Sequence, residues 1–432
     1  MRVLIQGGRV IDPARGIDAI RDVAIDGGLI RAIGEHVEPR GHEVIDARNA
    51  IVAPGFIDMH VHLREPGATQ KETIATGVAA AVAGGFTAVA CMPNTTPALD
   101  TPAALAEIRD RAAAAGLAHV HPVAALTRER AGVELAPYHQ LAKAGAVAFS
   151  DDGTTVANPR VLRNAALYAR DLAGPFISHC LDDALHGDAV MNEGAQSLRL
   201  GLPGSPKIAE ESIVARDLLI AGDTAKAWHI AHVSTAGSIE LIRWARSRGI
   251  AVTCEVTPHH LLLHDGLFVD SGYSARAKVA PPLRTEEDTA ALRAAVRDGT
   301  VDALATDHAP HTADEKAQLL SAAPVGFSGL EIALGAYADA LGDLPLDRFI
   351  ALLSTNPARI LGVPGGSLAV GARADVTIFA ERPWSVESRT FYSKGKNTPF
   401  EGRSFSRRAV ATVVAGRLAY SLERGVLAPA VA

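Results

Sequence analysis

Three features are scarce in this 432-residue sequence, and each scarcity excludes a class of protein. Only three cysteines occur, so far apart that they match no zinc-ribbon or redox spacing, and we expect buried thiols in a reducing cytoplasm. No apolar run reaches membrane-spanning length and no signal core follows the N-terminus, which predicts a soluble cytoplasmic protein without a membrane partner. The net charge of -6 and the pI near 6.2 lack the basic excess of a nucleic-acid binder, so we expect a small-molecule partner.

The length and composition are those of a globular chain with one large and one small domain. Hydrophobic residues make up 48% and charged residues 21%, which is ample for a core, while 432 residues exceed what one core usually supports. Short alternating segments with Gly-rich turns occur in residues 1–53 and again near the C-terminus. Because neither end can bury enough surface alone, we predict a small β-sandwich domain built from residues 1–53 plus 364–432.

Between these ends, apolar strands alternate with Ala-, Leu- and Arg-rich helical stretches, for example 101–115 and 285–298. Such alternation over roughly three hundred residues is typical of parallel βα units, either open and doubly wound or closed into a barrel. No Gly-x-Gly-x-x-Gly or phosphate loop follows an early strand, and candidate ligands follow many different strands. The sequence therefore predicts an α/β fold in which residues 54–363 form a (β/α)8 TIM-type barrel.

A His-x-His pair, His60 and His62, stands shortly after an apolar and β-branched run at residues 50–57. Side chains two residues apart on a strand point the same way, so both imidazoles can hold one cation from a strand end. For an isolated pair, two histidines satisfied by ordinary hydrogen bonds are the alternative. The buried-strand context and the Arg64 that follows favour the metal site.

Further metal-capable side chains stand behind short apolar runs along the rest of the barrel. They are Asp151 or Asp152, His179, His232 and Asp307. A lone His or Asp at a strand end more often caps a helix or bonds a turn. In a parallel barrel, however, the carboxyl ends of all strands converge on one face. The whole set therefore predicts one metal site, although the pattern alone does not separate Asp152 from Asp151.

Longer motifs around these residues are more specific. They include His60-Val61-His62-Leu63-Arg64-Glu65-Pro66-Gly67, Cys91-Met92-Pro93-Asn94-Thr95, Phe149-Ser150-Asp151-Asp152-Gly153, Thr257-Pro258-His259-His260 and Ala305-Thr306-Asp307-His308-Ala309-Pro310-His311. On these motifs essentially the whole chain resembles the class I dihydroorotases of the amidohydrolase superfamily.

The resemblance implies a barrel with a flanking β domain and a zinc centre with ligands on two sides: His60, His62 and Asp307, and opposite them His179 and His232. Many relatives bridge two metals with a carboxylated lysine, where this chain offers Asp152. Asp152 is chosen over Asp151 by the family's spacing, and Asp151 is left as a turn or capping residue. A plain carboxylate reaches less far, so we expect one tightly held zinc with or without a second, weaker metal.

The implied reaction is the reversible cyclisation of N-carbamoyl-L-aspartate to L-dihydroorotate, in de novo pyrimidine biosynthesis. Zinc would lower the pKa of bound water to about 7, and Asp307 would be the catalytic base that carries the proton to the departing nitrogen. Arginine suits the substrate carboxylate. The substrate-binding residues that the resemblance implies are His62, Arg64, Asn94, His311, Val325 and Gly326. The polar segment 312–318 is a candidate lid, with an inert surface loop as the alternative.

One departure and two rival functions stand beside this interpretation. Relatives commonly carry Asn before Pro-Pro-Leu-Arg, where this chain has Ala280, so a side-chain contact to the ring is missing. A hydantoinase or allantoinase is the first rival, but these usually keep the bridging lysine and lack an arginine at the position of Arg64. A non-catalytic partner of aspartate transcarbamoylase is the second, but such chains typically lose metal ligands.

The resemblance also bears on partners and on the remaining histidines. It is compatible with a homodimer and with a complex with aspartate transcarbamoylase. The histidines outside the ligand set are expected to pack or to support the ligands; they include His229, His259, His260 and His308.

Overall fold

The computed structural model describes residues 2–427; the remaining residues, 1 and 428–432, fall within the predicted terminal domain. Its centre is an eight-stranded parallel sheet in the order β15-β14-β13-β10-β9-β8-β7-β6. The sheet nearly closes on itself, because Val61 at the end of β6 bridges to His308, just beyond β15. The predicted α/β barrel is confirmed. Its strands are β6 Phe56–Val61, β7 Phe86–Cys91, β8 His119–Ala124, β9 Ala148–Phe149, β10 Phe176–Ser178, β13 Trp228–Ile230, β14 Val252–Val256 and β15 Ala303–Leu304.

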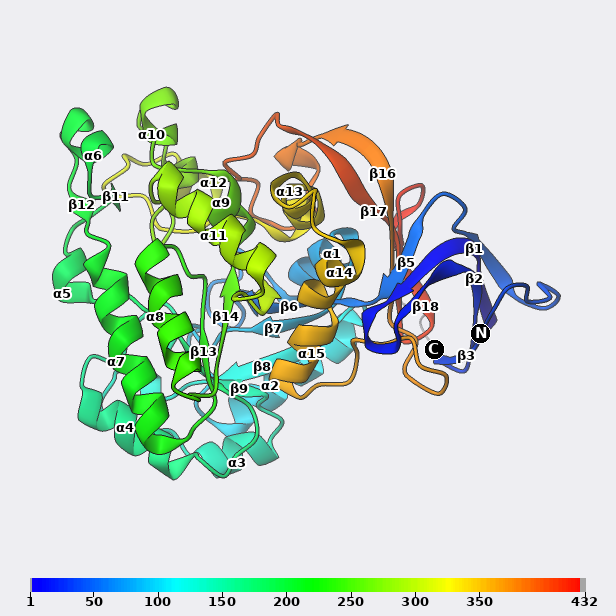
Figure 1. The fold of residues 1–432 in the computed structure, drawn as a ribbon, viewed down its shortest axis with the longest axis horizontal. Helices are drawn as coiled ribbons and strands as arrows, with labels where there is room; N and C mark the ends of the chain where they lie inside the picture. The colour runs from blue at the N-terminus through cyan, green and yellow to red at the C-terminus, as the bar shows by residue number, and fades with distance from the viewer. Residues whose placement is uncertain (1, 428–432) are drawn as a thin grey trace.

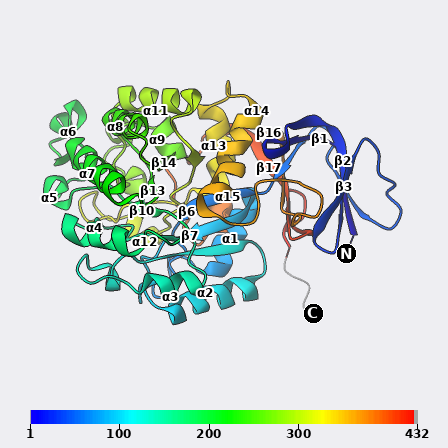
Figure 2. The same cartoon turned by 60° about the horizontal axis from the view of Figure 1, so that its bottom comes forward.

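Helices between the strands form the outer layer of the barrel (Figures 1 and 2). The two helices predicted from the sequence begin where a threonine caps them: Thr101 accepts the Ala104 N–H and Thr285 accepts the Asp288 N–H. The helices are α1 Ile74–Ala83, α2 Pro102–Ala115, α3 Tyr138–Lys143, α4 Pro159–Tyr168, α5 Asp183–His186, α6 Ala195–Leu200, α7 Ile208–Thr224, α8 Ala236–Ser247, α9 Pro258–Leu262, α10 Leu267–Asp270, α11 Glu286–Asp298, α12 Ala313–Lys316, α13 Ala333–Ala340, α14 Leu346–Leu353 and α15 Thr355–Leu361.

Strands from both ends of the chain share one nine-stranded sheet beside the barrel (Figure 1). The two ends meet where β5 pairs antiparallel with β16. Val10, Val52 and Ile378 lie in one buried apolar cluster, so residues far apart in sequence share a core. The strands are β1 Arg2–Asp12, β2 Ile17–Asp26, β3 Leu29–Gly34, β4 Glu43–Asp46, β5 Ile51–Pro54, β16 Val376–Ser385, β17 Ser404–Val414, β18 Arg417–Ser421 and β19 Gly425–Val426, while β11 Met191–Asn192 and β12 Gly204–Ser205 form a separate pair.

The terminal sheet contacts the barrel at the end where the barrel strands begin. Thr377 on β16 accepts the Phe56 N–H over 3.0 Å and donates to the Gly85 carbonyl over 2.6 Å, just before β7. The rings of Phe56 and Phe379 pack with centroids 5.8 Å apart. These contacts leave the carboxyl ends of the barrel strands on the far side. The division of the chain into residues 1–53 plus 364–432 and 54–363 stays a prediction.

The sequence predicts buried thiols and no membrane-spanning segment. Cys91, Cys180 and Cys254 are all free and buried. Over residues 2–427, none of the helices has both the length and the apolar character needed to cross a bilayer.

Candidate metal centre

The predicted ligands lie at the carboxyl ends of five different barrel strands. His60 lies in β6 and His62 directly follows it, while Asp152, His179, His232 and Asp307 follow β9, β10, β13 and β15. All six side chains are buried. Because these strands are parallel, their ends meet on one face, and the structure brings all six predicted residues together.

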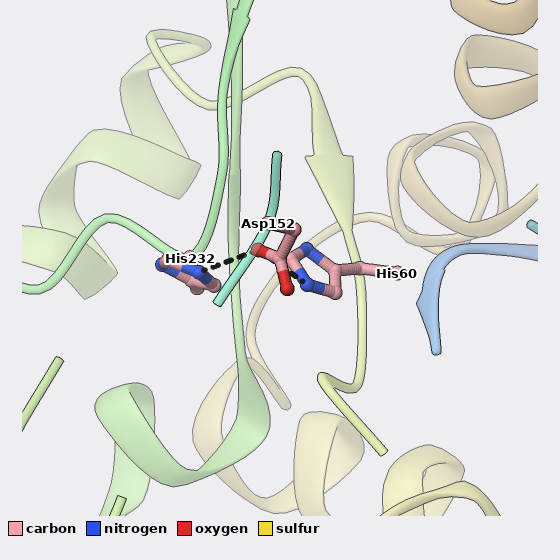
Figure 3. Close-up of side chains that lie close together, drawn as sticks. All are labelled: His60, Asp152 and His232. Atoms are coloured by element: carbon pink, nitrogen blue, oxygen red, sulfur yellow. Dashed lines mark ion pairs between the residues drawn. The ribbon is translucent and has the colours of Figure 1, made fainter. Parts of the chain in front are cut away.

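The carboxylate of Asp152 is the centre of this cluster (Figure 3). Its Oδ1 lies 3.2 Å from His60 Nε2, 3.6 Å from His232 Nε2 and 3.7 Å from His179 Nδ1. Its Oδ2 lies 3.5 Å from His62 Nε2. Burial opposes ionisation, but the neighbouring His60 holds the pKa of Asp152 well below its usual range. Asp152 is therefore an anion among imidazoles.

The adjacent carboxylate, Asp151, turns away from the cluster. Its Oδ1 accepts the backbone N–H groups of Leu126 and Thr127 over 2.8 and 3.0 Å. Its Oδ2 accepts a short hydrogen bond from the Thr127 hydroxyl. Asp152 thus faces the histidines, whereas Asp151 organises the loop after β8.

The ligand-type atoms form two groups that share His60. One contains His60, Asp152 and His232, and the other contains His60, His62 and Asp307, with all ligand atoms of a group within 4.8 Å of one another. His62 Nε2 lies 3.0 Å from Asp307 Oδ1. His179 stands outside both groups, but its Nδ1 is 3.0 Å from His232 Nε2. Burial and the neighbouring His232 lower the pKa of His179 to about 3, so its ring is neutral and can ligate.

The donor set fits a bound metal ion. His60 Nε2 and Asp152 Oδ1 face each other, yet among the described residues neither has a hydrogen-bond partner. Buried polar atoms are nearly always paired, and an unpaired set needs an explanation. Imidazole nitrogens and carboxylate oxygens are the ligands that zinc prefers, and a cation between them would satisfy both atoms.

Two buried acids that the sequence analysis did not select hold the ligands in place. Glu255 on β14 lies between His60 Nδ1, at 2.8 Å, and His229 Nε2, at 3.1 Å. Although burial opposes it, the hydrogen bonds from His229 and His60 lower the pKa of Glu255 to about 2. The carboxylate thus accepts a hydrogen bond from the Nδ1–H of His60, which leaves the Nε2 lone pair of His60 free for a metal. The sequence offers one signal for Glu255, which is the lone acid in the otherwise largely apolar run 252–256.

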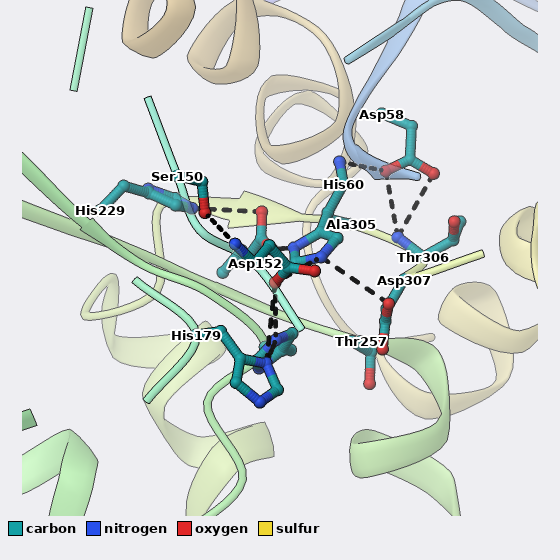
Figure 4. A network of polar contacts seen from close by, with 12 residues as sticks. Asp58, His60, Ser150, Asp152, His179, His229, Thr257, Ala305, Thr306 and Asp307 are labelled. Carbon is teal, nitrogen blue, oxygen red and sulfur yellow. Dashed lines mark hydrogen bonds and ion pairs between the residues drawn. The ribbon is translucent and has the colours of Figure 1, made fainter. Parts of the chain in front are cut away.

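The second acid, Asp58, ties two ligand-bearing segments together (Figure 4). Its Oδ1 accepts the N–H groups of His60 and Thr306, each over 3.1 Å. Burial raises the pKa of Asp58 to about 7. Through Asp58 the end of β6 is joined to the segment that carries Asp307, which fixes the spacing between the His-x-His pair and that carboxylate.

Replacing Glu255 with glutamine should lower metal affinity or turnover by about 10- to 100-fold, the usual cost of losing a partner behind a metal ligand. The amide keeps the size of the side chain but removes the charge that orients His60. Metal content per chain and turnover at graded metal concentrations measure the effect. Glu107→Gln, an exposed acid on α2, is the matched control. Unchanged metal affinity in Glu255→Gln would contradict the orienting role.

The backbone is strained where these side chains are presented. Among residues 2–427, nine non-glycine residues have a positive φ, and four of them border one pocket: Arg64, Arg130, His232 and Asp307. Such conformations cost about 1 to 3 kcal/mol each and gather at functional sites. The fold therefore holds these side chains in place against local preference.

A pocket of about 510 Å³ opens over the cluster, and it brings the predicted substrate-binding residues together. His62, Arg64, Asn94, His311, Val325 and Gly326 all border it, as does Ala280. Asn94 Oδ1 lies 2.8 Å from His62 Nδ1, so His62 donates there and keeps Nε2 as the metal-facing atom. Ala280 offers no side-chain donor to the pocket.

His311 and the loop after α12 form one wall of the pocket. His311 Nε2 lies 2.8 Å from the Val325 carbonyl and 3.3 Å from Arg64 Nη2. The shorter contact requires an N–H, so Nε2 donates to Val325. Burial and the Arg64 guanidinium lower the pKa of His311 to about 3, which keeps the ring neutral. Lys316 donates to the Pro324 and Gly326 carbonyls over 3.0 and 2.9 Å and holds the same loop.

Two protein families match overlapping parts of this chain. Residues 49–238 match the family described as dihydro-orotase-like, and residues 213–420 match the amidohydrolase family. A dihydroorotase of Anaeromyxobacter dehalogenans is 49% identical, over 98% of this chain and 98% of its own. Dihydroorotases of Pelobacter propionicus and Pelotomaculum thermopropionicum are 46% and 48% identical over 97% of this chain, and over 100% and 98% of their own.

Solved structures resemble this chain over almost its whole length. An L-hydantoinase (dihydropyrimidinase) from Arthrobacter aurescens has a TM-score of 0.87 at 24% identity, covering 99% of this chain and 97% of that one. A D-hydantoinase has a TM-score of 0.87 at 21% identity, with the same coverage. At these identities the likeness establishes the barrel fold and not the substrate.

Proposed function

Because this chain belongs to the dihydroorotase family of the amidohydrolases, we propose that its pocket interconverts N-carbamoyl-L-aspartate and L-dihydroorotate, with zinc as the cofactor. The protein is a hydrolase that acts on cyclic amides. The observation that carries the specific proposal is that the Arg64 guanidinium borders the same 510 Å³ pocket as the ligand cluster. A carboxylate-bearing cyclic amide needs both a metal centre and a planar cation within the reach of one small molecule.

The ligand cluster would hold one or two zinc ions, with His60, His62 and Asp307 on one side and His179 and His232 on the other. We propose Asp152 as a further ligand between the two sides, because its Oδ1 faces histidines of both sides and its Oδ2 faces His62. When bound, zinc supplies a nucleophilic hydroxide at neutral pH and polarises the amide carbonyl.

The residues around the cluster have separate roles in this proposal. Asp307 would take the proton of the attacking water and return it to the departing ring nitrogen. Arg64, Asn94 and His311 orient the substrate carboxylate, with His62 beside them, and the backbone at Val325 and Gly326 contacts the ring. Gly326 is suited to this because a Cβ there would lie 2.6 Å from the Ala309 Cβ and 2.8 Å from its carbonyl oxygen.

Neither rival function is favoured by a specific observation. The hydantoinases share the barrel, but Asp152 occupies the middle of the cluster and no lysine borders the described pocket. A non-catalytic role beside aspartate transcarbamoylase would not require six assembled ligands. We propose that the enzyme acts in the cytoplasm, and that it works as a homodimer or in complex with aspartate transcarbamoylase.

Purified, zinc-loaded protein should open L-dihydroorotate and leave hydantoin and allantoin untouched, because Arg64 has no carboxylate to bind in those rings. Closure consumes one proton, so the equilibrium should shift towards the ring by about tenfold for each unit fall in pH. Substrate loss and product formation are followed with and without added aspartate transcarbamoylase. Turnover of allantoin or hydantoin alone would overturn the proposal. Dihydroorotate turnover that requires the added partner would support the complex.

A further inference from the structure

A second arginine, Arg130, borders the pocket in addition to Arg64. We propose that Arg130 binds the second carboxylate of the open-chain substrate, the one that ring closure consumes. This inference rests on the proposed function and deepens it. Arg130 was not among the residues selected from the sequence.

The guanidinium of Arg130 lies on the Asp152 side of the pocket. Its Nη2 donates to the Asp152 backbone carbonyl over 2.8 Å. Gly153 separates it from Asn94: a Cβ on Gly153 would lie 3.1 Å from Asn94 Nδ2 and 3.3 Å from Arg130 Nη2. The guanidinium and the Asn94 amide therefore approach the same point of the pocket wall, beside the centre of the ligand cluster.

The backbone that presents Arg130 is held in an unfavourable conformation. Glu129 and Arg130 have φ values of 55° and 57°, within the short 3₁₀ turn Arg128–Arg130. Two consecutive non-glycine residues in this region need outside support. Asp100 supplies part of it by accepting the Glu129 N–H over 2.8 Å.

Asp151 supplies the rest of that support and connects the turn to the ligand cluster. It accepts the N–H groups of Leu126 and Thr127, and the Thr127 hydroxyl in turn accepts the Gly132 N–H over 2.8 Å. Because Asp151 precedes Asp152 in the chain, the loop that carries Arg130 and the central carboxylate are fixed to each other. This gives a buried acid that faces away from the cluster a function at the site.

The guanidinium has donors left for a ligand. An arginine has five N–H donors, and within residues 2–427 the Asp152 carbonyl is the acceptor that the Arg130 guanidinium bonds. Its Nε is buried without a partner. A half-buried cation with uncommitted donors in a pocket is a natural receptor for a carboxylate.

The two forms of the substrate differ in charge at the place where Arg130 lies. L-dihydroorotate carries one carboxylate, which the proposed function assigns to Arg64. N-carbamoyl-L-aspartate carries a second, formed from the carbonyl that reacts at the ligand cluster. Arg130 donates to the backbone carbonyl of Asp152, whose side chain is the centre of that cluster. We therefore place Arg130 at the carboxylate of the open form and not at the neutral amide of the ring.

The test compares Arg130→Gln and Arg130→Lys with Arg128→Gln. Arg128 is the matched control, because it belongs to the same turn but is 53% exposed and pairs with Glu134. In Arg130→Gln the KM for N-carbamoyl-L-aspartate should rise by about 10- to 100-fold, as for loss of a hydrogen bond to a charged group. The KM for L-dihydroorotate should stay within about twofold, and Arg130→Lys should recover part of the loss.

The equilibrium constant of the reaction cannot change, so kcat/KM must change by one common factor in both directions. The difference between KM values therefore carries the test, with metal content and thermal unfolding measured alongside. Equal KM increases for both substrates, no increase at all, or loss of metal in Arg130→Gln and Arg130→Lys would overturn the inference. A wild-type enzyme without activity on dihydroorotate would instead refute the proposed function, so the two failures are distinguishable.

Discussion

Replacing His60 with alanine should remove bound metal and abolish turnover. His60 belongs to both groups of ligand atoms, and its Nε2 lies 3.2 Å from Asp152 and 3.7 Å from Asp307. Losing a partner behind a ligand already costs about 10- to 100-fold, so loss of this shared ligand should cost at least about 100-fold in activity. Metal analysis by mass spectrometry and the dihydroorotate assay measure the two effects together.

His121→Ala is the control for removal of an imidazole as such. His121 lies on β8, does not border the pocket, and should leave metal content and turnover unchanged. Thermal unfolding of both variants with added chelator separates metal loss from misfolding, because bound metal stabilises the folded state. Turnover retained by His60→Ala would remove the basis for a shared metal centre.

The barrel could be predicted because its signals are local and repeated. The strands that precede the candidate ligands lie in short apolar runs, and the threonines at 101 and 285 mark helix starts that the structure reproduces. The bridge that nearly closes the barrel, between Val61 and His308, joins residues far apart in sequence. It has no local signal and followed only from the number and order of the strands.

The terminal sheet was predicted from composition and not from pairing. Both ends have the texture of short strands, and burial requires them to combine. The register of β5 against β16, with Val52 opposite Ile378, depends on side-chain packing between segments more than three hundred residues apart. No propensity within either segment specifies that partner.

The candidate site likewise has one part that the sequence predicts and one part that it does not. Ligands at strand ends follow from the barrel, because the topology fixes where those ends meet. Asp152 and Asp151 differ only in which way each side chain points, and that depends on the N–H groups of Leu126 and Thr127 in another loop. Arg130 belongs to a charged segment that by itself predicts an exposed turn. Its strained turn is created by tertiary hydrogen bonds, and these bring Arg130 to the pocket. The place of such a residue in the site follows from the three-dimensional structure and not from its local sequence.

Replacing Asp307 with asparagine should stop proton transfer while leaving much of the metal bound. Asn has nearly the same shape and keeps one oxygen that can ligate, but it cannot accept a proton from water. Burial opposes ionisation, yet His62 and His60 hold the pKa of Asp307 well below its usual range, so the wild-type side chain is an unprotonated carboxylate at neutral pH. Turnover should fall by about 10²- to 10⁴-fold, the usual contribution of general acid-base catalysis.

Asp183→Asn provides the matched control, because Asp183 borders the same pocket but is exposed and contacts none of the six ligands. Metal content, kcat and KM are measured for both variants in both reaction directions. The base role requires a fall in kcat with little change in KM, since the interaction is made in the transition state. An Asp307→Asn variant that binds wild-type amounts of zinc and keeps its kcat within about threefold would show that another group moves the proton. If Asp307→Asn binds no zinc, Asp307 acts as a metal ligand. In that case Asp307→Glu, which restores a carboxylate, should recover bound zinc before it recovers turnover.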